Sequence, residues 1–153
     1  MEMEKLVPLS EDLTVDDHKL DIFIGMEEAL KNTDDVPFKA EEEFAEGDWA
    51  VKSSAGELEE ASDAGVYNTY PVWAGNADRY DVHATGKGTI ITTGGWVYRT
   101  TKFDTSITDY ADGEALTVKD GKVPTRAGGS DAVLARVYKA PVDGIMEIQV
   151  TRG

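Results

Sequence analysis

One glycine-rich stretch of the sequence contains the residue types that bind phosphate groups. Residues 83–95 read His-Ala-Thr-Gly-Lys-Gly-Thr-Ile-Ile-Thr-Thr-Gly-Gly. A Walker-type loop needs a glycine six positions before the lysine, a Ser or Thr directly after it, and then a helix. Around Lys87, those two positions hold Asp81 and Gly88, and the residues that follow are β-branched. We therefore interpret the stretch as a strand with a turn at each end.

The histidines and the paired carboxylates are the other candidates for metal binding or acid–base chemistry. His18 and His83 have acidic neighbours, but they lack the spacing of a helical His-x-x-x-His pair. No Asp-x-Asp-x-Asp-Gly calcium loop includes the acidic pairs, which are Asp34 with Asp35 and Glu59 with Glu60. The absence of cysteine excludes disulfides and thiolate metal sites. We predict no catalytic residue, no metal and no cofactor, and hence a protein that is not an enzyme.

Aromatic residues are concentrated between Tyr67 and Phe103. Aromatic side chains beside arginines form protein-binding hot spots and sugar-binding platforms, but they also fill the cores of small β-domains. For Trp73 and Trp96 the core is the favoured position, whereas some of the tyrosines are expected to stay partly exposed. The aromatic candidates for an interface are Tyr70, Tyr80, Trp96 and Tyr98.

Charge limits the classes of partner. The chain of 153 residues has 30 acidic and 15 basic residues, a formal net charge of −15. Residues 1–46 hold 15 of the acidic and 4 of the basic residues. Such a charge repels nucleic-acid phosphates and anionic lipid headgroups, so neither nucleic acid nor a membrane is expected as a partner.

The hydrophobic pattern divides the chain near residue 47. Residues 1–46 mix short apolar clusters with acidic runs, and they predict an extended N-terminal arm with at most one short helix around residues 25–31. From residue 47 to residue 153 the period changes to two, which is typical of β-strands. The chain length suits one compact unit. We predict an all-β fold, either a small β-barrel or β-tulip-like domain or a sandwich, with about eight or nine strands.

Two hairpins are clearly marked in this β region. Leu116 and Val118 alternate with polar residues before an Asp120-Gly121 turn, and Pro124 assigns the returning strand to a sheet edge because proline lacks a donor N–H. A second Asp-Gly turn, at residues 143–144, lies between two alternating segments. Their predicted inward residues are Val133, Ala135, Val137, Met146, Ile148 and Val150.

The β region resembles the decoration, or cement, proteins of tailed-bacteriophage heads. The similarity covers roughly residues 46–151. It consists of a Gly-Asp-Trp opening strand, a Pro-Val-Trp strand followed by an Asp-rich turn, a Gly-Glu-Ala-Leu-Thr-Val hairpin and a closing Gly-Ile-Met-Glu-Ile strand pair. The resemblance implies a β-barrel-like domain, often a homotrimer, that binds the major capsid protein on the outside of the expanded capsid. It also implies synthesis in the bacterial host cytoplasm and a final location on the virion exterior.

An arm that becomes ordered on contact would provide affinity for the capsid by strand addition. The side chains predicted to be buried against a neighbour are Leu6, Val7, Leu9, Leu13, Ile22 and Phe23. Two alternative functions stay open. One is another phage structural subunit, in the tail tube or the head–tail joint. The other is a carbohydrate-binding β-sandwich with Tyr70, Trp96 and Tyr98 as its platform.

Overall fold

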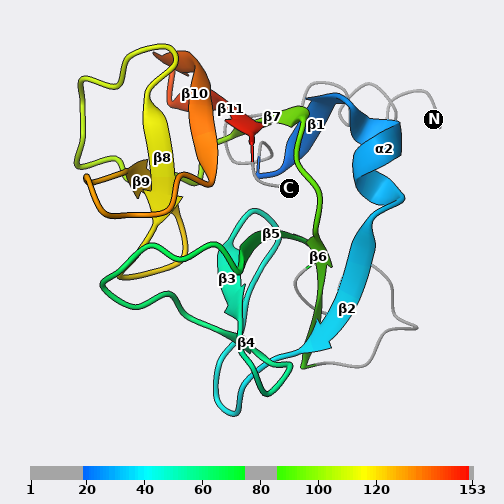
Figure 1. Cartoon of the computed structure of the whole chain (residues 1–153). Coiled ribbons are helices and arrows are strands. Elements are labelled where there is room, and N and C mark those ends of the chain that lie inside the picture. The colour runs from blue at the N-terminus through cyan, green and yellow to red at the C-terminus, as the bar shows by residue number, and fades with distance from the viewer. Residues whose placement is uncertain (1–18, 75–85, 152–153) are drawn as a thin grey trace, which may run out of the picture.

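The computed structural model describes residues 19–74 and 86–151. Within these residues, one antiparallel sheet has six strands in the order β1 (Asp21–Ile24), β7 (Trp96–Thr100), β11 (Ile145–Val150), β10 (Ala135–Val142), β8 (Ala115–Val118) and β9 (Pro124–Arg126). A second sheet has five in the order β2 (Thr33–Pro37), β6 (Lys87–Ile91), β5 (Thr69–Ala74), β3 (Trp49–Lys52) and β4 (Leu58–Glu59). Figure 1 shows the six-stranded sheet above the five-stranded one. The predicted all-β fold is confirmed, with two sheets that do not close into a barrel.

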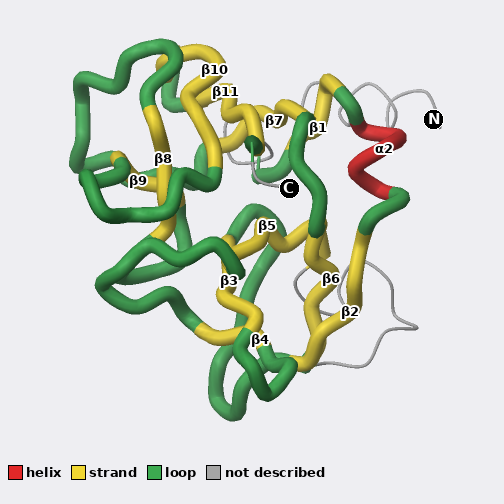
Figure 2. Tube along the Cα trace, viewed as in Figure 1, coloured by secondary structure: helices red, strands yellow, loops and turns green. Residues whose placement is uncertain are grey.

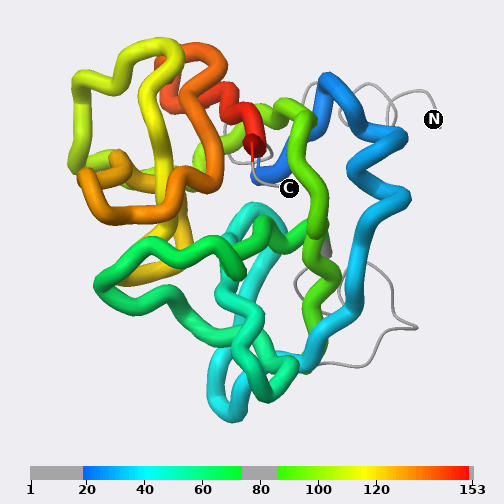
Figure 3. Tube along the Cα trace, in the orientation of Figure 1, coloured from blue at the N-terminus to red at the C-terminus, as the bar shows by residue number. Residues whose placement is uncertain are grey.

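The described part of the acidic N-terminal region belongs to both sheets. β1 pairs with β7 and β2 pairs with β6, so the blue and cyan chain runs beside the green chain in Figure 3. The boundary expected at residue 46 therefore does not separate two structural parts within the described residues. Each strand buries one apolar side chain, Ile22 or Val36, while its carboxylates stay at least partly exposed. A single inward side chain per strand is too short a pattern for periodicity to detect.

A short helix, α2 (Met26–Leu30), connects these two strands and confirms the helix expected around residues 25–31. Gly25 precedes it with a φ of 77°. A side chain there would be strained by this φ, and its Cβ would lie 3.1 Å from the Cβ of Trp96. Ala29 is fully buried in the core, which fixes the helix against β7. Among the described residues α2 is the one helix, and it is the red segment in Figure 2.

Two clusters of apolar side chains form the core. The larger includes inward residues of both sheets, among them Trp49, Trp96 and Tyr98. The smaller takes one residue from each strand of the five-stranded sheet, together with Phe44, and consists of Val36, Phe44, Ala50, Leu58, Val72 and Ile90. Successive residues of a strand point to opposite faces. The middle strands of the five-stranded sheet, β6, β5 and β3, are therefore covered on both faces.

The five-stranded sheet curls so that its two edges approach each other. Phe38, just after β2, forms an isolated bridge with Leu58 of β4, and the amide of Lys39 donates to the carbonyl of Leu58 at 2.8 Å. Gly88 of β6 faces the inside of this curl opposite Val36. A Cβ at residue 88 would lie 2.9 Å from Cε1 of Phe38. The glycine therefore leaves the space that the Phe38 ring occupies.

The described part of the Gly-Lys stretch has the predicted strand-and-turn structure. Residues 87–91 form β6, and Gly86 and Gly95 have φ angles of 89° and 92°. No helix follows the strand, since the chain continues directly into β7. The interpretation of two turns around one strand is confirmed for residues 86–95.

Both predicted hairpins are confirmed. Asp143 and Gly144 join β10 to β11 with φ angles of 54° and 79°, as a tight turn requires. The predicted inward residues Met146, Ile148 and Val150 are each fully buried. Val133 lies before β10 and is only partly buried, and its neighbour Leu134 is buried instead. Strand β9, which begins at Pro124, is an edge strand as predicted.

Candidate interaction surface

The outer face of the six-stranded sheet presents a row of alternating charges. Register places Asp21 of β1 opposite Arg99 of β7, Arg99 opposite Glu147 of β11, and Glu147 opposite Lys139 of β10. These residues alternate along their strands with inward residues such as Ile22, so all four side chains share the outer face. Across four neighbouring strands, the charges therefore read minus, plus, minus, plus.

Ion pairs within the chain hold the middle of this row in place. The guanidinium of Arg99 lies 3.2 Å from the carboxylate of Asp21 and 3.6 Å from that of Glu147. All three side chains are partly exposed, so each pair contributes at most about 1 kcal/mol to stability. Strand register sets the order of charges, and these ion pairs orient the three side chains.

Aromatic rings lie next to the charged row. The rings of Phe23 and Tyr138 meet edge to face with centroids 6.2 Å apart, although two strands separate β1 from β10. The guanidinium carbon of Arg99 lies 4.0 Å from the Phe23 ring centroid, within range of a cation–π interaction. Val97, which points outward like Arg99, is only 2% exposed. The outer face thus has a small packed aromatic layer of its own.

Two β-bulges explain how the rings reach each other. The ladder register shifts between Ile22 and Ile24 in β1, and again between Val137 and Lys139 in β10. The residue inside each shift is Phe23 or Tyr138. A bulge re-aims the side chain of its extra residue. The two aromatic side chains are therefore directed over the middle strands.

Exposed aliphatic side chains extend this layer. Ile24 is 41% exposed, Tyr138 45% and Val142 57%. By register, Ile24 is paired with Val97, and Val142 with Ile145. Residues of β7, β10 and β11 also line a shallow depression on this face. We define the outer face by Asp21, Phe23, Ile24, Val97, Arg99, Arg136, Tyr138, Lys139, Val142, Ile145, Glu147 and Gln149.

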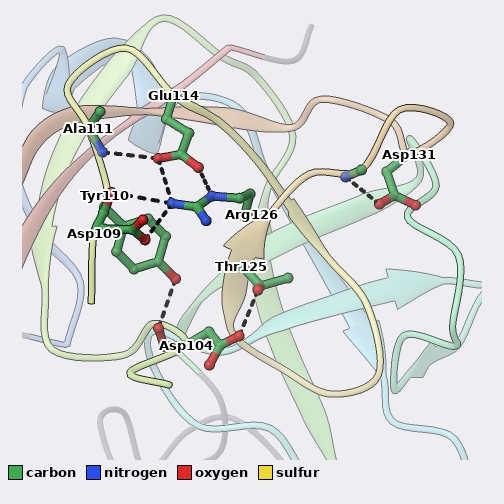
Figure 4. Close-up of polar contacts among 9 residues, drawn as sticks. Asp104, Asp109, Tyr110, Ala111, Glu114, Thr125, Arg126 and Asp131 are labelled. Carbon is green, nitrogen blue, oxygen red and sulfur yellow. Dashed lines mark hydrogen bonds and ion pairs between the residues drawn. The ribbon is translucent and has the colours of Figure 1, made fainter. Parts of the chain in front are cut away.

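A second polar cluster lies around Arg126 in β9 (Figure 4). The guanidinium donates to both carboxylate oxygens of Glu114 and, at 2.9 Å, to the carboxylate of Asp109. The amide of Ala111 also donates to Glu114. Hydrogen bonds from Arg126 lower the pKa of Glu114 and that of Asp109. A general acid needs a raised carboxyl pKa, whereas the pKa values of these two carboxyls are lowered. The arrangement therefore suits an arginine that holds a loop in place.

Asp104 completes the cluster and is also fully engaged. Its carboxylate accepts hydrogen bonds from the hydroxyls of Ser106 at 2.6 Å and Thr125 at 2.7 Å, which lower its pKa. Its backbone carbonyl accepts from the hydroxyl of Tyr110 at 2.8 Å. Burial raises the pKa of Tyr110 to about 12. The described groups of this cluster satisfy one another and hold the segment 104–114 against β9.

Asp131 fastens another pair of loops. Its carboxylate accepts from Lys119 at 2.6 Å, from the amide of Gly128 at 2.8 Å and from the amide of Gly65 at 3.1 Å. These contacts, led by the one from Lys119, lower the pKa of Asp131 to about 2. The carboxylate therefore stays charged wherever the protein is folded at ordinary pH. Figure 4 shows Asp131 at some distance from the Arg126 cluster.

Several predicted site residues lie in the core instead of at a surface. Trp96 is 1% exposed, which confirms the core position favoured for it. Tyr98 is fully buried, so the alternative assignment of these two rings to an interface or a sugar platform is wrong. Both point toward the larger cluster because strand alternation gives them the inward face of β7. Tyr70 is partly buried against the smaller cluster. Tyr80 lies outside the described residues.

The residues expected to contact a partner divide in a similar way. Ile22 is 5% exposed within its own chain's core, so its expected burial against a neighbour is wrong. Phe23, by contrast, is on the outer face, half-buried by Arg99 and Tyr138. The other candidates lie outside the described residues and are Leu6, Val7, Leu9 and Leu13.

Of the remaining candidates for chemistry, the described ones form separate ion pairs. His18 and His83 lie outside the described residues. Asp34 forms an ion pair with Lys52 at 2.9 Å, and Glu59 forms one with Lys39 at 3.6 Å. Within residues 19–74 and 86–151, no three His, Asp or Glu side chains are grouped as metal ligands. Among the described helices, none has the length and apolar character of a membrane span.

Sequence reasoning missed most of the outer face. Tyr138, Val142 and Ile24 are not among the predicted site residues, although Tyr138 directly follows the predicted inward residue Val137, so that alternation directs it outward. That alternation was the available signal.

Comparison with known proteins adds no relative, since no family model, curated protein or solved structure matches this chain.

Proposed function

We propose that the protein is a structural protein that binds the outside of an assembled phage capsid, as the decoration proteins that its sequence resembles do. The observation that supports a binding role is the outer face of the six-stranded sheet. It combines aromatic and aliphatic side chains with an arginine, which is the composition of protein interfaces. In the described parts of the chain, by contrast, the clustered carboxylates of the Arg126 cluster are occupied in holding loops.

The contact with the major capsid protein is assigned to the apolar residues before β1. Leu6, Val7, Leu9 and Leu13 form the clusters that the sequence offers for docking. Ile22 is removed from that set because it packs in the core of its own chain. Removing residues 1–24 would delete β1 together with this core residue. Point substitutions in the full chain are therefore the appropriate test.

The experiment mixes the purified full-length protein with expanded, undecorated phage capsids and measures co-sedimentation. Saturable binding and a higher temperature of capsid disruption are expected. The variant Leu6→Asp with Leu9→Asp should bind at least about tenfold more weakly, since each buried leucine contributes about 1.5–3 kcal/mol. A matched control adds the same two charges in an exposed turn, as Ser54→Asp with Ala55→Asp.

The outcomes separate cleanly. Normal binding by the control variant and weak binding by the leucine variant support the proposal. If both variants bind equally well, the contact does not involve residues 6–9, but the proposed capsid-binding function stands. Absence of binding by the unaltered protein to capsids of candidate phages would overturn the proposed function itself.

A further inference from the structure

We propose that the outer face of the six-stranded sheet binds the same face of a second copy, related by a two-fold axis. The charges in the row follow the order Asp21, Arg99, Glu147 and Lys139 on four successive strands. The capsid proposal places its contact on the residues before β1, so the pairing of this face can fail without affecting capsid binding. A two-fold pair is also an alternative to the homotrimer that the resemblance implies.

A two-fold rotation about an axis parallel to the strands makes this row complementary to itself. The rotation reverses the order of the strands, so the position of Asp21 in one copy faces Lys139 of the other. By the same operation Arg99 faces Glu147 of the other copy. Both contacts occur twice, as in every isologous interface. All four charges of the row thus gain an opposite charge across the interface.

The same geometry brings the aromatic layers together. Phe23 lies on the β1 side of the face and Tyr138 on the β10 side. Exchanging the two sides places Phe23 of one copy against Tyr138 of the other. A two-fold axis perpendicular to the strands would instead face Asp21 with Asp21 and Arg99 with Arg99. Like charges in direct opposition disfavour that arrangement, so the row selects one axis.

Charge also distinguishes this face from the chain as a whole. The chain has a net charge of −15, and two copies therefore repel each other in general. On the outer face, three basic residues (Arg99, Arg136 and Lys139) stand against two acidic ones (Asp21 and Glu147), a net of +1. Repulsion between copies is thus reduced where these faces meet.

The size of the face indicates a weak pair. Four strands spaced about 4.8 Å apart, with six residues of about 3.3 Å each, cover roughly 400 Å² per copy. Specific interfaces of ordinary strength bury about 800 Å² per partner. Pairing is therefore expected at high micromolar concentration, and it would be strengthened where many copies occupy one lattice.

The test uses two single charge reversals, Asp21→Lys and Lys139→Asp, in the full chain. Within one copy, these residues lie at opposite ends of the row with two strands between them. Alone, each variant places two like-charge contacts in the pair and should associate about a hundredfold more weakly. In an equimolar mixture, a mixed pair has both contacts complementary again. Sedimentation equilibrium at protein concentrations up to about 500 µM measures the fractions of monomer and dimer for the unaltered protein, each variant and the mixture.

The expected result is a dimer for the unaltered protein, monomers for each variant, and a restored dimer in the mixture. A monomeric or trimeric unaltered protein would overturn the proposal, and so would a mixture that stays monomeric. Circular dichroism checks that each variant is folded. Should a reversal prevent folding, Tyr138→Ser removes a partly exposed ring without changing charge, and an unweakened dimer would then contradict the proposal. The Leu6→Asp and Leu9→Asp variant should still pair.

Discussion

Replacing Tyr98 by phenylalanine tests how the two sheets are joined. The indole Nε1 of Trp49, in the five-stranded sheet, donates to the hydroxyl of Tyr98, in the six-stranded sheet, at 2.9 Å. Both side chains are fully buried, and burial raises the pKa of Tyr98 above its ordinary value. The substitution removes the acceptor and leaves a buried N–H without a partner.

The expected cost is about 1–3 kcal/mol, since an orphaned buried donor loses its desolvation energy. For a chain of this length, each kcal/mol lowers the melting temperature by about 2–4 °C, so a fall of roughly 2–12 °C is expected. Equilibrium urea denaturation should show a lower midpoint and an unchanged m-value. A loss of less than about 0.5 kcal/mol would refute the role of this hydrogen bond.

Two variants make the measurement specific. Tyr110→Phe also removes a phenol hydroxyl, which donates to the carbonyl of Asp104 at 2.8 Å near the surface. Water can replace that donor, so a loss of about 0.5–1.5 kcal/mol is expected. The double variant of Trp49→Phe with Tyr98→Phe removes both partners. Its coupling energy with the single variants should be about 0.5–3 kcal/mol.

Three further substitutions have defined outcomes. Gly88→Ala should cost about 1–3 kcal/mol by thermal denaturation, because its Cβ would clash with Phe38. The pKa of Asp131 in the folded state is about 2, below its ordinary value. The charged carboxylate therefore stabilises the fold above pH ~4, and this contribution is lost as the pH falls toward 2. Asp131→Asn should therefore lower the urea midpoint at pH 7 and flatten its decline below pH 4. Arg126→Gln should accelerate chymotryptic cleavage after Tyr110 by about fivefold or more, since the segment 104–114 loses its central donor.

The parts of the fold that sequence could predict are those with local causes. Asp143-Gly144 requires a tight turn, and Pro124 requires a sheet edge; both depend on the residues themselves. The pairing of β1 and β2 in the sheets could not be predicted, because one inward apolar side chain per strand is too short a pattern for periodicity to detect. In the folded chain, one buried side chain in each, Ile22 or Val36, is enough to place it in a sheet.

Alternation indicates which side chains of one strand share a face, but the residues that meet on the candidate surface depend on register and could not be predicted. Trp96 and Tyr98 are two residues apart and so share one face of a strand, but the pattern does not say whether that face is inward. The aromatic contact of the outer face forms through two bulges, at Phe23 and Tyr138. A bulge changes the pairing of one residue without any fixed sequence signature. The meeting of these two rings thus becomes visible only in three dimensions.

The pairing of β1 with β7 has a consequence for biosynthesis. Asp21 and its partner Arg99 are 78 residues apart. At about 5–20 residues per second, the ribosome takes roughly 4 to 16 s to add the intervening chain, and Ile22 has no ladder partner during that time. Carboxylates are frequent on both sides of this hydrophobic segment. Such flanking charges oppose aggregation of a nascent chain, so the acidity of the first 46 residues protects an N-terminal strand that must wait for its neighbour.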